Sequence, residues 1–187
     1  MHAAGAHLRD QAGGAYNTGQ ARRLLGGEGA DVIGFTAWRE GLALAPRLAG
    51  QVSGVSDLAR LGLRVVNREP GSEARQVLDR ELLRLGLEPG ALPGYDTRAG
   101  GHLQVAAAIA AGLAEAGVSA EPAALAYGLP FVPLADERFD LVIPHQVAES
   151  REVQSMLRVL TSPWLLAQLD SLPGYDASHC GAQVTTL

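Results

Sequence analysis

The stretch LRVVNREPGSEARQVLDRELLRLG, residues 63–86, joins a short apolar segment to an amphipathic one through a glycine–serine turn. Residues 63–67 contain one leucine and two adjacent valines, which indicates a short buried strand. From about Ser72 to Leu85, apolar residues recur at helical spacing, and Gly86 ends the pattern, as is typical of an α-helix. This stretch therefore predicts a strand, a tight turn and a helix in succession.

The segments on either side continue this alternation. Further strands are predicted at residues 31–38, 42–45, 116–119, 131–134 and 140–144. Further helices are predicted at residues 18–25, 57–60, 102–114, 122–127, 152–160 and 163–172. Residues 89–101 read as a loop, and the tail after Gly174 shows little pattern. Strands that alternate with helices predict an α/β fold whose mainly parallel sheets carry helices on their faces.

Composition narrows the class of protein. The 187 residues suffice for one domain or for two small lobes, and the formal net charge is -5. All 15 basic residues are scattered arginines, so the chain lacks the basic surface expected for direct nucleic-acid binding. The first residues do not resemble a signal peptide, and no run of about 18 apolar residues predicts a membrane span. A cytoplasmic location is the resulting expectation.

The turn at Gly71 and Ser72 is the first candidate binding site. A helix N-terminus offers N–H groups and a partial positive charge, which suit a tetrahedral oxyanion. Gly71 lets the backbone approach a ligand, Ser72 adds a hydroxyl, and Arg75 lies one turn into the helix. Glu73 argues against an anion there. The alternative is a plain helix cap made by Ser72 and Glu73.

Three further residues are candidate ligand contacts. His102 opens an alanine-rich helix after Gly100 and Gly101, so it either meets a ligand or is an ordinary loop histidine. Arg39, next to Glu40, either binds an anion or forms an ion pair. For His7, the lining of a binding cleft is implied only by a family resemblance of the histidine–leucine pair at residues 7–8.

Catalysis and metal binding lack support in the sequence. Cys180 is the single cysteine, and the pair His2 and His7 has only Asp10 nearby, too few ligands for a metal. Neither a Gly-x-Ser-x-Gly elbow nor a phosphate-binding glycine motif occurs. We therefore expect no catalytic residue, no metal and no cofactor.

Five stretches, taken in order, carry a resemblance to a known family. They are AGAHLRD with GAYN at residues 4–10 and 14–17, REGL at 39–42, NREPGSEAR at 67–75, HLQVAA at 102–107 and LADERFDLVIP at 134–144. Together they resemble the type II periplasmic-binding-protein-like domain of molybdate-binding proteins. Such domains also occur fused to helix-turn-helix transcription regulators and to enzymes of molybdenum-cofactor synthesis.

The resemblance implies two lobes. Residues 1–46 and 134–187 would form the first lobe, and residues 47–133 the second, with ligand at helix N-termini beyond the carboxyl ends of strands. Two departures from the family stand out. Its opening strand–helix–strand precedes the matched region, so the first lobe is expected to lack it. The family also prefers glycine and threonine at Glu73 and Ala74, and an acidic residue at Arg98.

Three functional hypotheses follow. The first is a non-catalytic domain that binds or senses a small oxyanion, with molybdate or tungstate implied by the resemblance, and signals to a fused or partner regulator. The second is a truncated or repurposed binding fold that acts in oligomerisation, for example as a homodimer, or in protein interaction. The third is an enzyme of molybdenum-cofactor synthesis, which rests on domain fusion alone.

Overall fold

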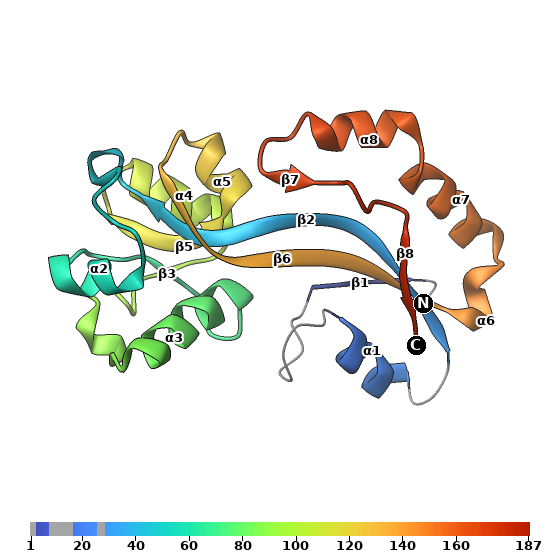
Figure 1. Cartoon of the computed structure of the whole chain (residues 1–187), viewed down its shortest axis with the longest axis horizontal. Coiled ribbons are helices and arrows are strands. Elements are labelled where there is room, and N and C mark those ends of the chain that lie inside the picture. The colour runs from blue at the N-terminus through green and yellow to red at the C-terminus, as the bar shows by residue number, and fades with distance from the viewer. Residues whose placement is uncertain (1–2, 8–16, 26–28) are drawn as a thin grey trace. The chain divides into compact units, whose positions relative to one another are not determined.

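The computed structural model describes residues 3–7, 17–25 and 29–187 (Figure 1). The chain forms two compact units. Unit 1 contains Met1–Trp38 and Glu137–Leu187, and unit 2 contains Arg39–Asp136. The sequence had placed these boundaries after residue 46 and before residue 134. Two long strands, β2 (Ala30–Leu44) and β6 (Phe131–Pro144), include both boundaries.

Unit 2 places its helices on both sides of a small set of strands. Its helices are the 3-10 turns Pro46–Leu48 and Pro89–Ala91, α2 (Val55–Leu61), α3 (Glu73–Leu85), α4 (His102–Ala110) and α5 (Glu121–Ala126). Its own strands are β3 (Asn67–Arg68), β4 (Arg98–Ala99) and β5 (Ala116–Ala120). β5 pairs with the end of β2.

The core of unit 2 follows the alternation of side chains along β2. Leu42 and Leu44 are buried in one apolar cluster with residues of α2 and α3, while Ala43 is buried in a second cluster with residues of α4 and α5. Successive side chains of a strand point to opposite faces, so β2 supplies both layers. This explains why its sequence is apolar at every position from residue 42 to residue 44.

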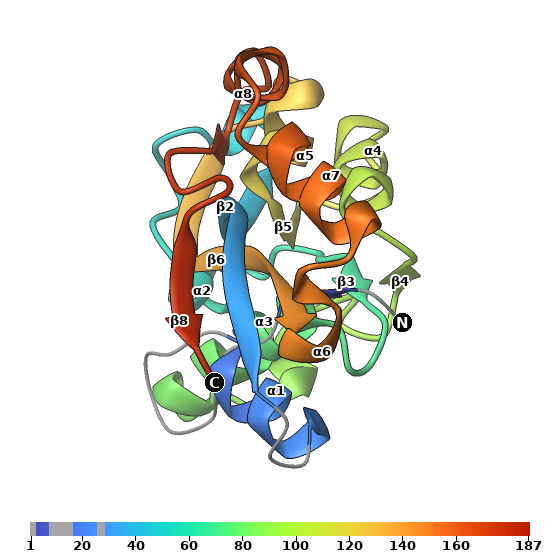
Figure 2. The same cartoon turned by 90° about the vertical axis from the view of Figure 1, so that its right-hand side faces the viewer.

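Unit 1 is built from both ends of the chain. Its remaining elements are β1 (Ala4–Ala6), α1 (Thr18–Leu25), α6 (His145–Ala148), α7 (Arg151–Leu160), α8 (Pro163–Asp170), β7 (Tyr175–Asp176) and β8 (Gln183–Thr186). β1 pairs with β6, and both β7 and β8 pair with β2. Figure 2 shows β8 running alongside β2.

The long strands correct two sequence predictions. Residues 31–38 and 42–45 were predicted as separate strands, and so were 131–134 and 140–144, but each pair is continuous. Gly41 stands in the middle of β2 because the backbone of β6 approaches it: an added Cβ would collide with the Val132 carbonyl oxygen and lie 2.8 Å from the Pro133 Cα. Asp136 and Glu137 lie within β6.

Strand direction also differs from the prediction. The pairs β1–β6, β2–β5, β2–β7 and β2–β8 are antiparallel. Among the described residues, parallel pairing occurs between β3 and β4 and at the bridge of Val65 with Ala116. The α/β fold is confirmed, but parallel pairs do not dominate, because alternating elements do not by themselves fix which strands become neighbours. In the described part of the chain, no helix has the length and apolarity to span a membrane.

Candidate functional site

Three helices of unit 2 begin at one edge of its strands, as Figure 1 shows. β3, β4 and β5 share a direction through their parallel contacts, and each is followed by a helix: α3, α4 and α5 respectively. Glu40 of β2 lies opposite Ala120, the last residue of β5. We call residues 67–72, 100–102 and 120–121 together with Glu40 the helix-start edge. Ligands of α/β folds characteristically bind at such edges.

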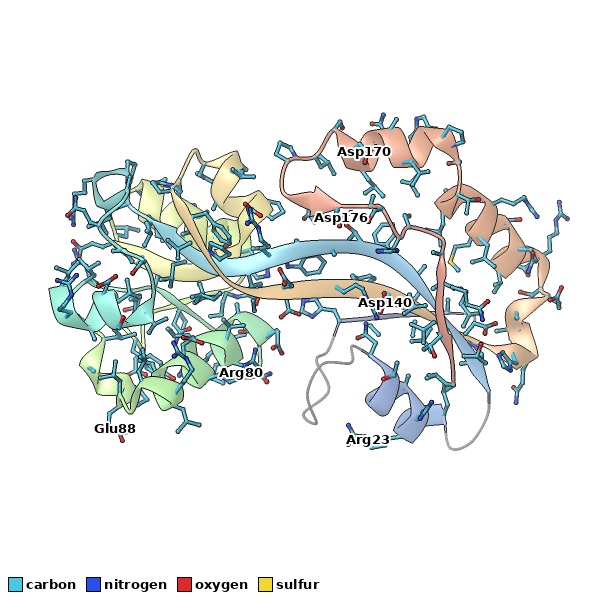
Figure 3. All side chains as sticks on the ribbon, viewed as in Figure 1. Arg23, Arg80, Glu88, Asp140, Asp170 and Asp176 are labelled. Carbon is cyan, nitrogen blue, oxygen red and sulfur yellow. The ribbon has the colours of Figure 1, made fainter. Side chains whose placement is uncertain are left out.

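The start of α3 is occupied by its own cap. The Ser72 hydroxyl accepts a hydrogen bond from the Arg75 N–H at 3.4 Å and donates one to the Glu69 carbonyl at 2.9 Å. Gly71 has a φ of 90°, in the left-handed region that suits glycine in this tight turn. Glu73, the first helical residue, pairs with Arg80 at 2.8 Å. Arg80 is labelled on α3 in Figure 3. These contacts match the capping alternative and place a carboxylate at the helix start.

Arg75 is held away from the cap hydroxyl by contacts within unit 2. Its guanidinium lies 4.6 Å from the centre of the Tyr95 ring, and Nη1 donates to the Arg68 carbonyl at 3.3 Å. Nε lies 3.8 Å from Asp79, which accepts a 2.6 Å hydrogen bond from the Tyr95 hydroxyl. The Arg75 side chain thus ties α3 to the loop that contains Tyr95.

Arg68 and Glu69 form an ion pair beside the turn. Two guanidinium nitrogens of Arg68 donate to the two Glu69 carboxylate oxygens at 2.8 and 2.9 Å. These hydrogen bonds are the largest cause that lowers the pKa of Glu69 to about 2, and the charge of His102 contributes to a smaller degree. The ion pair thus keeps the Glu69 carboxylate charged beside the turn that precedes α3.

We expect Arg68→Gln to raise the pKa of Glu69 toward its ordinary value of 4.5. Because the folded-state pKa is lowered, this carboxylate stabilises the fold above about pH 4.5, and its contribution is lost as the pH falls toward 2. The measurement is an NMR titration of the side-chain carboxyl carbon. Arg84→Gln, at an exposed pair with Glu81, is the control. A Glu69 midpoint that stays near 2 in Arg68→Gln contradicts the assigned cause.

The start of α4 differs from that of α3. Its N-cap residue is Gly101, no side chain caps it, and its first turn carries no acidic residue. The His102 ring is held by β5 and β2: Nδ1 accepts a hydrogen bond from the Ala120 N–H at 3.1 Å, and Nε2 lies 3.4 Å from a carboxylate oxygen of Glu40. The Ser119 hydroxyl donates to the His102 carbonyl at 3.1 Å. These contacts fix the orientation of the helix start.

Arg39 belongs to an ion pair at the start of α5. Its guanidinium donates two hydrogen bonds to Glu121, the first residue of this six-residue helix. These bonds raise the pKa of Arg39. The structure thus places Arg39 in an ion pair, one of the two alternatives considered for it, although the partner is Glu121 and not the adjacent Glu40.

His7 lies in unit 1, where it meets other aromatic rings. Its ring centre is 5.2 Å from that of Trp38, which in turn lies 6.2 Å from Tyr175. Residues 8–16 of the motif around it lie outside the described residues. At the end of this motif, the Asn17 amide donates to the buried carboxylate of Asp140 at 2.8 Å.

The candidates are thus divided between the units. Gly71, Ser72, Arg75, His102 and Arg39 all lie in unit 2, and His7 lies in unit 1. Sequence reasoning assigned no role to Glu40, which is fully buried beside His102. In the sequence it stands between Arg39 and Gly41, and only the apolar residues from 42 onward hint that it belongs to a buried strand. Among the described residues, no group of three or more metal-ligating side chains is found.

A family comparison gives this fold its name. The model of the PBP superfamily domain matches residues 1–161 of the chain. The chain belongs to the PBP superfamily. It thus has the fold of ligand-binding and sensor domains of the periplasmic-binding-protein type. The resemblance found in the sequence is confirmed at this level, and the molybdate-binding branch stays a prediction.

One relative matches nearly the whole chain. The Bacillus subtilis (strain 168) protein named Uncharacterized protein YvgK is 33% identical over 175 residues, which are 94% of this chain and 56% of that protein. The chain therefore spans just over half the length of this relative.

Solved structures show the same fold at low identity. A histidine kinase sensor domain with similarity to periplasmic binding proteins has a TM-score of 0.54 and 16% identity, over 93% of this chain and 70% of that one. A LysR substrate-binding domain from Wolinella succinogenes has a TM-score of 0.56 and 10% identity, over 91% of this chain and 78% of that one.

Proposed function

We propose that this PBP domain binds a small oxyanion at the start of α4 and acts as a sensor or carrier without catalysis. The observation that carries the proposal is the contrast among the three helix starts. α3 begins with a side-chain cap and Glu73, and α5 begins with Glu121, whereas α4 begins with Gly101 and neither feature. The N–H groups in the first turn of a helix have no acceptors within the helix, so a bound anion can accept their hydrogen bonds.

Two further observations support the same helix. Gly101 is extended, with a φ of −172°, and Gly100 has open space around its Cα, so a ligand can approach the backbone closely. The contacts from Ala120 and Ser119 hold His102 in place before a ligand arrives. A preorganised site does not lose binding free energy to ordering.

Molybdate and tungstate are the first ligands to test, because the sequence motifs resemble those of molybdate-binding domains. In a regulator, binding would shift the population of conformations that a fused or partner domain reads. The family resemblance supports the choice of anion, and the contrast among the three helix starts supports the choice of α4 as the site.

The test is a calorimetric titration with molybdate, tungstate, sulfate and phosphate, together with thermal melting. Selective binding of molybdate or tungstate with a Kd near micromolar, about −8 kcal/mol, is the expected result. Ligand at 100 times its Kd stabilises the fold by about 2.7 kcal/mol, which raises the melting temperature by roughly 5–10 °C. Absence of heat and of a melting shift with all four anions would refute the proposal.

A further inference from the structure

A pocket of about 390 Å³ lies in unit 2 between β4 and α4. Val66, which is 3% exposed, lines it. Gly100 borders both this pocket and the start of α4, and from there the pocket extends past Gln104 to Ala108 and Leu113. Binding sites for small molecules typically have volumes of about 300–1,000 Å³. We call this pocket the side pocket, and it has room for a small organic molecule.

Arg98 gives the side pocket a positive charge. Among the described residues that line the pocket, Arg98 is the one that carries a charge. Most arginines of unit 2 lie in an ion pair with a carboxylate. The side chain of Arg98, by contrast, makes no hydrogen bond or ion pair with the residues that the structure describes. Asp96, the nearest acidic residue in the sequence, lines a different pocket. The guanidinium N–H groups of Arg98 are therefore available to an acceptor on a ligand.

Two neutral polar side chains line the same pocket. The Thr97 hydroxyl and the Gln104 amide make no hydrogen bond within the described part of the chain, and both can donate one to an oxygen atom. The rest of the lining is apolar and includes Ala108 on α4 and Leu113 beyond it. Leu113 is 70% exposed, so a ligand with apolar atoms would remove part of its surface from water.

We propose that the side pocket binds a small organic carboxylate that has a short apolar tail. The planar guanidinium of Arg98 matches the two oxygens of a carboxylate and can donate two parallel hydrogen bonds to them. The apolar lining at Ala108 and Leu113 accommodates the tail. Arg98 would repel a cation, and an inorganic oxyanion would leave the apolar lining exposed to water. The inference goes beyond the oxyanion site at the start of α4 and does not depend on it.

The test is an NMR titration of the full ¹⁵N-labelled chain with pentanoate. Saturable binding with a Kd on the order of 1 mM is expected, because the ligand is small and buries few atoms. The backbone amide signals of residues 97–100, 104 and 108–114 should shift most, since these residues surround the side pocket. The titration thus measures both the affinity and the place of binding.

Three comparison ligands separate recognition of a carboxylate from general anion binding and from general apolar binding. Pentanamide has nearly the same shape without the charge, and it should bind at least about tenfold more weakly, because hydrogen bonds to charged groups are stronger. Acetate should also bind more weakly, because each buried methylene group raises affinity by at most about fourfold. Sulfate has charge but no tail, and it should shift the same amides much less at equal concentration.

Arg98→Gln should lower the affinity for pentanoate at least about tenfold, because it removes the charge and the paired donors. Arg98 is exposed, so the fold should be unaffected. Arg64→Gln is the matched control. Arg64 is another exposed arginine of unit 2 that has no ion pair among the described residues, and it does not line the side pocket. The affinity of this variant for pentanoate should equal that of the wild-type chain.

The inference is wrong if pentanoate causes no saturable shift at roughly ten times the expected Kd. It is also wrong if the shifted amides lie elsewhere in the chain, or if Arg98→Gln and Arg64→Gln bind pentanoate equally well. Equal affinities for pentanoate and sulfate would identify a plain anion site and contradict the role of the apolar lining. If molybdate and the other inorganic anions fail to bind, the proposed function fails, and the pentanoate result stands independently.

Discussion

Aspartate in place of Gly101 should lower the affinity for molybdate by about 100-fold or more while leaving the fold intact. The backbone of Gly101 is extended, so a larger residue adopts it without strain, and the added Cβ meets only the movable end of the Gln104 side chain. As an N-cap, aspartate accepts the first-turn N–H groups of α4 and stabilises the helix by a few tenths of a kcal/mol relative to glycine. It also repels an anion. The loss of one or two charge-assisted hydrogen bonds to molybdate accounts for this decrease in affinity of about 100-fold.

The matched control for this substitution is Gly54→Asp. Gly54 is the N-cap of α2, it is also extended, with a φ of 179°, and nothing lies within 4 Å of an added Cβ. The same charge is thus placed at another helix start of the same unit. Calorimetry should find wild-type affinity in Gly54→Asp. Molybdate affinity within threefold of wild type in Gly101→Asp would exclude the start of α4 as the binding site.

The largest effect on stability is expected from Leu78→Ala. Leu78 lies on α3 with 1% of its surface exposed, packed in the cluster that includes Leu42, Leu58 and Val118. Its truncation removes buried methyl groups and leaves a cavity, which costs about 3 kcal/mol in the free energy of unfolding. Denaturation by urea, followed by circular dichroism, measures the change.

Leu83→Ala serves as the control on the same helix. Leu83 is 81% exposed, so its truncation should alter stability by less than about 0.5 kcal/mol. The two leucines have the same helix propensity and lie five positions apart on α3. Equal losses in the two variants would contradict the packing described for α3.

Elements decided by local chemistry were predicted correctly from the sequence. α3 is an example: its apolar stripe, the Ser72 cap and the Gly86 stop all act within one helix, and Gly86 indeed has a φ of 66°. α8 is another, since Ser162 caps it and Pro163 begins it. Such signals do not depend on the rest of the chain.

Elements decided by distant partners were missed. Gly41 looked like a break in the strand, yet its small size serves the approach of β6 from residues far along the chain. β7 and β8 have little pattern of their own and become strands through pairing with β2.

The candidate site was predicted only in part, because some of its contacts join residues that are distant in the chain. The helix starts with Gly71, Ser72 and His102 were visible in the sequence, because glycine and helix signals are local. The partners were not: the contacts of Arg39 with Glu121 and of His102 with Glu40 join residues far apart in the chain. A sequence shows that a charge exists but not which charge lies beside it.

Because unit 1 is built from two separate segments of the chain, it can complete its folding only after unit 2 has been synthesised. Unit 2 is one uninterrupted segment, Arg39–Asp136, so its core can close once that segment has left the ribosome. Unit 1 cannot complete its sheet at that point, because Asp31 of β2 pairs with Thr186 of β8, and the two residues are separated by 155 residues in the chain. At ordinary rates of synthesis the remaining segment takes roughly 3–10 s to emerge. During this interval the early strands of unit 1 lack their partners, and their open edges can pair with other strands.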